Sequence, residues 1–142
     1  GKLGNVVGIY PGETDRRIVL GSHIDSVPNG GMFDGCLGVL GGLEVVRTLN
    51  DHEVSTLRPI ELAIWTEEEG CRFGTDMLGS AVAAGRITEA QARSLTDAGG
   101  ISVGAELDRH GLRRDLTTFD GSALDGHRAR LHRFLGPGGR HQ

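Results

Sequence analysis

Three short segments contain the residues that could bind a metal ion and move a proton. His23 and Asp25 lie in the run Gly-Ser-His-Ile-Asp-Ser-Val-Pro, Asp34 lies in a glycine-rich stretch that follows it, and three consecutive carboxylates, 67–69, come directly after an apolar run. One imidazole and several carboxylates, without paired cysteines, suit Zn²⁺, Mn²⁺, Co²⁺ or Ni²⁺ better than a structural thiolate zinc site. Two such ions, about 3.5–4 Å apart and bridged by a carboxylate, would activate a water for hydrolysis.

Each segment also has a simpler interpretation. Side chains two apart on a strand share a face, so Asp25 could orient a metal-binding His23, or the two could form a hydrogen-bonded surface pair. Asp34 could be a metal ligand or only the N-cap of the helix that follows. The carboxylates 67–69 could be a solvated surface run. Carboxylates crowded at the end of an apolar strand are costly unless a cation neutralises them, which favours the metal site.

The surrounding pattern predicts an α/β sheet with helices packed on it. Short apolar runs predict strands at 5–10 and 17–23, and the continuously apolar run 59–66 predicts a central strand. Apolar residues at three- and four-residue steps predict a helix over 34–50, although it contains Gly38, Gly41 and Gly42, which need a reason such as close packing on the sheet. Thr88 and Gln91 form a capping box for a helix ending near residue 98, and Ser102 caps another that runs to residue 110.

Composition and charge exclude several classes of protein. The 142 residues include 15 basic and 19 acidic ones, and 127–142 holds four arginines and no acid, which leaves 1–126 strongly acidic. An acidic body is a poor nucleic-acid binder, and no run is apolar enough to predict a membrane span. Two cysteines make no disulfide framework, so we predict a cytoplasmic location. We interpret 1–126 as a catalytic segment and 127–142 as a separate basic tail, disordered or aberrant.

Taken together, the motifs resemble the hydantoinase/carbamoylase amidase family, which includes N-carbamoyl-L-amino-acid hydrolases and allantoate amidohydrolases. The resemblance rests on Gly-Ser-His-Ile-Asp-Ser-Val-Pro-Asn-Gly-Gly-Met-Phe-Asp-Gly, Trp-Thr-Glu-Glu-Glu-Gly-Cys-Arg-Phe-Gly and Met-Leu-Gly-Ser, in this order, and spans about residues 3–111. It implies an aminopeptidase-like mixed sheet flanked by helices, of which this chain is an incomplete part. It also implies that full-length relatives are homodimers.

By that resemblance, His23 is a ligand of one divalent ion, Asp34 bridges two ions, and Glu69 is a ligand of the other. Asp25 orients His23, and Glu68 is the general base. The implied reaction is attack of a metal-bound hydroxide on the carbamoyl or ureido carbon of a small substrate, which breaks a C–N bond.

The chain also departs from the family's pattern. Glu67 stands where the family usually has Asn, an added charge that the sequence does not explain. His132 lies in Leu-His-Arg-Phe-Leu-Gly-Pro, which half matches the family's Leu-His-x-Glu-Gln-Gly-Pro, and is either a further metal ligand or an unligated His in the tail. With only three assured ligands for two ions, we expect the isolated chain to bind metal weakly and to have little activity.

Two other functions stay open, and three further residues have simple interpretations. The chain could derive from an aminoacylase- or dipeptidase-like metallopeptidase, or be a truncated, non-catalytic fragment whose tail reflects a shifted reading frame. We predict that Arg72 forms a salt bridge with a neighbouring Glu, the alternative being an anchor for the loop or for a substrate anion. Cys36 and Cys71 are interpreted as small packing residues.

Overall fold

The structure is a computed structural model that describes residues 3–112. Its sheet consists of β1 (Val6–Tyr10), β2 (Ile18–His23) and β3 (Ile60–Trp65), in the order β1-β3-β2. The three predicted strands are therefore confirmed. The tail 127–142 and His132 lie outside the described residues.

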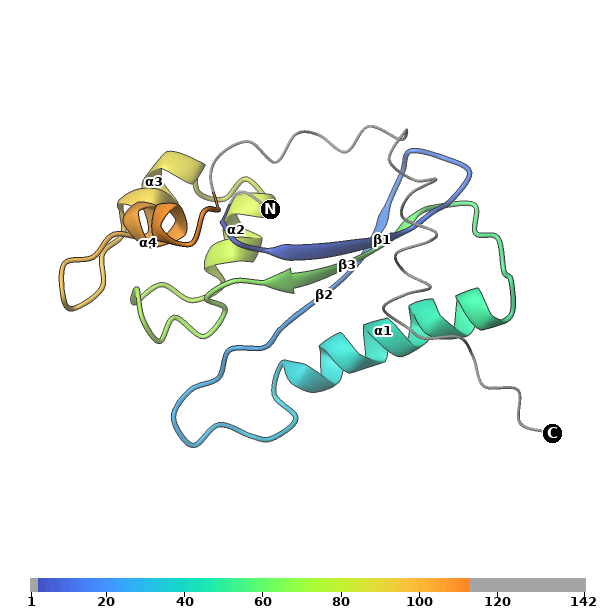
Figure 1. Cartoon of the computed structure of the whole chain (residues 1–142), viewed down its shortest axis with the longest axis horizontal. Coiled ribbons are helices and arrows are strands. Elements are labelled where there is room, and N and C mark those ends of the chain that lie inside the picture. Colours follow the sequence, from blue (N-terminus) through green and yellow to red (C-terminus); the bar gives the residue numbers. More distant parts are fainter. Residues whose placement is uncertain (1–2, 113–142) are drawn as a thin grey trace.

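The sheet is mixed, and β3 is its central strand as predicted. β1 pairs antiparallel with β3, whereas β2 pairs parallel with it, with His23 opposite Trp65. Because β2 and β3 are parallel, their carboxyl ends lie at the same edge of the sheet (Figure 1). The segments that follow the two strands therefore start side by side.

The helix α1 (Cys36–Asp51) links β2 to β3 and lies along one face of the sheet (Figure 1). Val39 and Val46 are buried on its inner side. A Cβ on Gly38 would come within 2.4 Å of the Ser22 hydroxyl, and one on Gly42 within 2.5 Å of Leu62, so these glycines let the helix approach the strands closely.

The expectation of close packing does not hold for Gly41. A Cβ at this position would meet no atom within 4 Å beyond its own helix, because Gly41 lies on a different side of α1 from Gly38 and Gly42. Three glycines in one helix thus have two different environments, and the tight contact with the sheet uses the pair spaced four residues apart.

Three short helices gather at the end of the sheet where β3 finishes (Figure 1). They are α2 (Leu78–Ala83), α3 (Glu89–Ser94) and α4 (Val103–Arg109). Their buried side chains form a small core with Leu3, and α2 contacts β3. This small core supports the loop that follows β3.

The predicted caps are confirmed, but the predicted end of one helix is wrong. The Thr88 capping box and the Ser102 N-cap are both present. The helix that Thr88 opens ends at Ser94 rather than near residue 98, because Leu95 turns to an extended conformation and Thr96 forms a β-bridge with Ser102. A local tertiary pairing therefore replaces the last predicted turn.

The helix α2 was not predicted from the sequence. The helix is only six residues long. It begins after Met77, whose backbone has a left-handed conformation, and no side chain caps it. The observed class, a mixed sheet with helices, agrees with the predicted α/β class. Within residues 3–112, no helix is long and apolar enough to span a membrane.

Candidate metal centre

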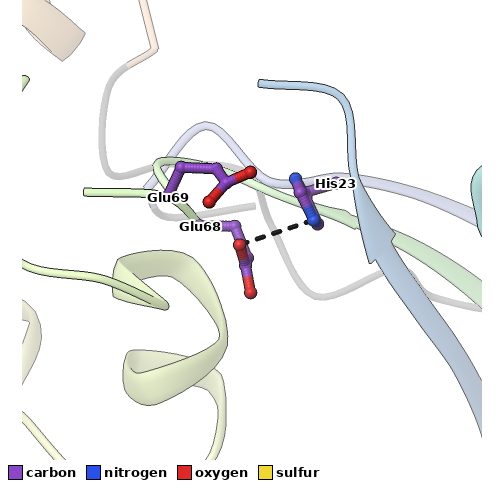
Figure 2. Close-up of side chains that lie close together, drawn as sticks. All are labelled: His23, Glu68 and Glu69. Atoms are coloured by element: carbon purple, nitrogen blue, oxygen red, sulfur yellow. Dashed lines mark ion pairs between the residues drawn. The ribbon is translucent and has the colours of Figure 1, made fainter. Parts of the chain in front are cut away.

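The predicted site residues that the structure describes come together at the carboxyl edge of the parallel strand pair. His23 ends β2, and Glu68 and Glu69 follow β3. Figure 2 shows the His23 imidazole facing the two glutamates. Asp34, just before α1, lies near His23 because the loop after β2 leads back to the strand ends before α1 starts.

His23 is held in one orientation by Asp25. Its side chain is buried, with the residue 7% exposed. Nδ1 lies 3.0 Å from the backbone carbonyl oxygen of Asp25, which can only accept, so Nδ1 donates and, in the neutral ring, the lone pair is on Nε2. Nε2 faces Glu68 Oε2 at 3.4 Å and Asp34 Oδ1 at 3.6 Å.

The Asp25 carboxylate connects the two strand ends. Its Oδ1 is 3.6 Å from His23 Nδ1, beyond a normal hydrogen bond, while its Oδ2 accepts a hydrogen bond of 3.1 Å from the Glu69 backbone N–H. Asp25 therefore positions His23 mainly through its carbonyl and fixes the backbone of Glu69 through its side chain.

The donor set fits a divalent cation. His23, Glu68 and Glu69 each offer a ligand atom, and these atoms lie within 4.8 Å of one another. Glu69 Oε1 is buried and has no hydrogen-bond partner, although a buried carboxylate oxygen is costly when it has none. A cation between the imidazole and the carboxylates would satisfy this oxygen. Asp34, whose side chain is 53% exposed, lies at the open side of the group.

Asp34 does not cap α1. The N-cap is Gly35, at φ 67°, and no side chain caps this helix, so the interpretation of Asp34 as an N-cap is wrong. Gly35 packs directly under His23, because a Cβ there would lie 2.5 Å from the His23 carbonyl oxygen and 2.6 Å from the ring. Its own carbonyl accepts a 2.7 Å hydrogen bond from the Ser22 hydroxyl.

The loop after β3 is held by contacts that the sequence analysis missed. Glu67 Oε1 accepts hydrogen bonds from the backbone N–H groups of Arg72 and Phe73, both at 2.7 Å. Asn5, before β1, accepts from the Thr66 N–H and donates to the Gly79 carbonyl. The sequence marked Glu67 only as an added charge and did not mark Asn5, because each side chain acts on backbone that is distant in sequence or folded back by a turn.

Arg72 forms ion pairs, but not with the glutamates next to it in sequence. Its guanidinium lies 3.1 Å from Asp97 and 3.2 Å from Glu106, and it also stacks over the Phe73 ring. The predicted partner was therefore wrong, since the chain after α3 brings two more distant acids to the loop. Hydrogen bonds from Arg109 and then Arg72 lower the pKa of Glu106 to about 2.

The two cysteines are exposed, so their interpretation as packing residues is wrong. The Cys71 Sγ lies 3.7 Å from the Ser26 carbonyl oxygen. Desolvation, followed by the negative charge of Glu69, raises the pKa of the Cys71 thiol above its usual value. Because the thiolate is the reactive form, this cysteine is a poor nucleophile at neutral pH.

We expect Glu106 to make the fold more resistant to acid. A carboxylate whose pKa is lowered by folding contributes stability that is present above its unfolded pKa and is lost as the pH falls through the folded pKa. Chemical unfolding of the chain and of Glu106→Gln between pH 7 and pH 2 should show a constant advantage for the unmodified chain above about pH 4.5, declining towards about pH 2. An advantage that is unchanged at pH 2 would contradict this role.

The chain is similar to known hydrolases over most of its length. The model of peptidase family M28 matches residues 5–125. An N-carbamoyl-L-amino acid amidohydrolase from Geobacillus stearothermophilus is 48% identical over 114 residues, which is 79% of this chain and 28% of that protein. A ureidoglycolate hydrolase from Oryza sativa is 39% identical over 97 residues, covering 67% of this chain and 20% of that protein.

The chain is also similar in fold and sequence to a solved structure. The crystal structure of a hydantoinase/carbamoylase family amidase from Burkholderia ambifaria superposes with a TM-score of 0.74 at 47% identity, over 79% of this chain and 28% of that one. The chain thus spans less than a third of the length of these relatives. Because the family model matches most of it, the chain belongs to peptidase family M28, and its similarity within that family is to amidases of the hydantoinase/carbamoylase type.

Proposed function

We propose that this chain forms part of the catalytic domain of a metal-dependent amidohydrolase that cleaves a C–N bond of an N-carbamoyl-L-amino acid or a ureido compound. The observation that carries the proposal is the convergence of His23, Glu68 and Glu69 at one edge of the sheet, where Glu69 Oε1 is buried without a partner. The names of the relatives supply the substrate class.

In this proposal, His23 Nε2, Asp34 and Glu69 would hold two divalent ions of the Zn²⁺, Mn²⁺, Co²⁺ or Ni²⁺ type. Asp34, whose Oδ1 lies 3.6 Å from His23 Nε2, would be the ligand shared by both ions, as the resemblance to the amidase family implies. Asp25 keeps the lone pair of His23 on Nε2. Divalent ions bound here would lower the pKa of a water and polarise the carbonyl of the substrate.

Glu68 moves the proton in the proposed reaction. Its Oε2 faces His23 Nε2 at 3.4 Å, on the side where a water would sit between the ligands. The carboxylate takes a proton from the attacking water, whose oxygen forms a bond to the carbamoyl or ureido carbon. The C–N bond then breaks, and Glu68 passes the proton to the leaving nitrogen. The oxygen of the water thus ends in the product that keeps the carbonyl carbon, and the transferred proton ends on the nitrogen of the other product.

Peptidase-type chemistry is a second candidate, and the name of the matched family favours it. An aminoacylase or dipeptidase would use the same residues on an acyl or peptide carbonyl. Hydrolysis of N-carbamoyl, N-acetyl and dipeptide substrates that share one amino acid separates the two, if it is measured on the full-length gene product. Faster turnover of the N-acetyl substrate or the dipeptide would overturn the carbamoylase assignment.

The metal site can be tested on the 142-residue chain itself. We expect Co²⁺ to bind weakly, because the chain supplies few ligands, and we expect His23→Ala to weaken binding by at least about tenfold. Visible absorption of bound Co²⁺ or calorimetry measures the affinity. The matched control is His52→Ala, which removes an exposed imidazole at the far end of α1. Equal affinities of the two variants would contradict the site.

A further inference from the structure

We propose that Glu67 is a positioning residue of the metal centre, which holds the loop carrying Glu68 and Glu69 in the shape that binds metal. The proposal rests on the proposed metal site and adds to it a residue that would not itself touch the ion. Its basis is the pair of 2.7 Å hydrogen bonds that one carboxylate oxygen of Glu67 accepts from the Arg72 and Phe73 N–H groups.

The backbone conformation at Glu67 explains why the loop needs these two hydrogen bonds, which we call the clamp. Its φ is 53°, in the left-handed region that favours glycine and that a glutamate adopts only at a cost. This conformation turns the chain sharply after β3, so that Glu68 faces His23. The Glu67 carboxylate accepts two short hydrogen bonds that close the loop over residues 67–73 and offset that cost.

Other hydrogen bonds hold the first part of the loop, residues 66–69. The Glu67 carboxylate holds the part that follows. The carbonyl groups of 66–68 accept hydrogen bonds of 2.6–3.1 Å from the N–H groups of 77–79, at the start of α2. The Glu69 N–H is held by Asp25. These bonds fix the first limb of the loop, and the Glu67 carboxylate ties the second limb, 72–73, back to it.

Loss of this clamp should appear as weaker metal binding. Without an acceptor at position 67, two backbone N–H groups must turn to water, and the segment carrying Glu68 and Glu69 samples more conformations. Binding a cation then has to order the loop as well, so the affinity falls. Outer partners of this kind typically contribute about 10–100-fold to metal affinity.

Three substitutions separate the hydrogen bonds from the charge. Glu67→Gln and Glu67→Ala remove the same negative charge, but only Gln keeps an oxygen that can accept from both N–H groups. Glu67→Asp keeps the charge and draws the oxygens back by one methylene. We expect Co²⁺ affinity to fall by about tenfold or more in Glu67→Ala and Glu67→Asp, and to stay close to the unmodified value in Glu67→Gln. Glu44→Gln, an exposed change on α1, controls for net charge.

Amide hydrogen exchange gives a readout that does not need metal. Protection of the Arg72 and Phe73 amides should fall in Glu67→Ala and Glu67→Asp but not in Glu67→Gln. Equal Co²⁺ affinities of the Ala and Gln variants would overturn the positioning role, and so would an Asp variant that binds like the unmodified chain. An unmodified chain whose Co²⁺ binding does not depend on His23 would instead overturn the metal site, a result distinguishable from the other two.

Discussion

Replacing Glu68 with glutamine is expected to lower kcat by about 10²–10⁴-fold while the bound metal content stays the same. The amide keeps the size and the hydrogen-bonding reach of the side chain, but it cannot take the proton from the attacking water. Because Glu68 lies 3.4 Å from His23 Nε2, its loss removes the proposed base from the centre of the site. Turnover of an N-carbamoyl amino acid by the full-length gene product, together with metal analysis of the same sample, measures both quantities.

This experiment also decides between two roles for Glu68. His23, Glu68 and Glu69 can together hold one ion, so Glu68 could instead be a ligand. If it is, Glu68→Gln loses metal in parallel with activity, and the base must be sought elsewhere. Glu44→Gln, which neutralises an exposed carboxylate on α1, should change neither quantity. Unchanged turnover in Glu68→Gln would contradict both roles.

Gly35→Ala is expected to destabilise the fold and to disrupt the metal centre together. The Gly35 backbone, at φ 67° and ψ −57°, lies outside the regions that residues with a Cβ normally adopt, and such a conformation costs them about 1–3 kcal/mol. The new methyl would also lie 2.6 Å from the His23 ring and 2.5 Å from the His23 carbonyl, so His23 or α1 must shift. We therefore expect the free energy of unfolding to fall by more than about 1 kcal/mol and the Co²⁺ affinity to fall with it.

Gly31→Ala is the matched control for this change. It makes the same substitution in the same loop, but its Cβ would meet no atom within 4 Å, and Gly31 is not among the glycines with positive φ. Denaturant unfolding and Co²⁺ titration of both variants give the comparison. If Gly35→Ala behaves like Gly31→Ala in both measurements, Gly35 does not support His23.

The strands and the main helix could be predicted because their signals are local. The apolar run that became β3 was too continuous for an edge strand, and β3 is the central strand of the sheet. The Thr88 and Ser102 caps were also visible, since each acts on an N–H group three residues away. The end of α3 was not predictable in this way, because a β-bridge between Thr96 and Ser102 decides it.

The residues that meet at the strand ends could be picked out from the sequence, but the contacts that support them could not. His23, Asp34 and the carboxylates after β3 stand out by residue type and by their position after strands or before a helix. Glu67 was singled out only as an unexplained charge, whereas the structure gives it two backbone partners. Arg72 was assigned a partner close in sequence, yet its partners come from beyond α3.

By itself, the sequence determined which groups are available for chemistry: an imidazole and several carboxylates in three motifs, on an α/β pattern that brings strand ends together. Residue types and short spacings carry that information. Only the tertiary structure decided that Nε2 of His23 faces the carboxylates, that Glu69 Oε1 is buried without a partner, and that Glu67 closes the loop. Those properties depend on distances of a few ångströms between segments far apart in the chain, which packing of the sheet and α2 sets.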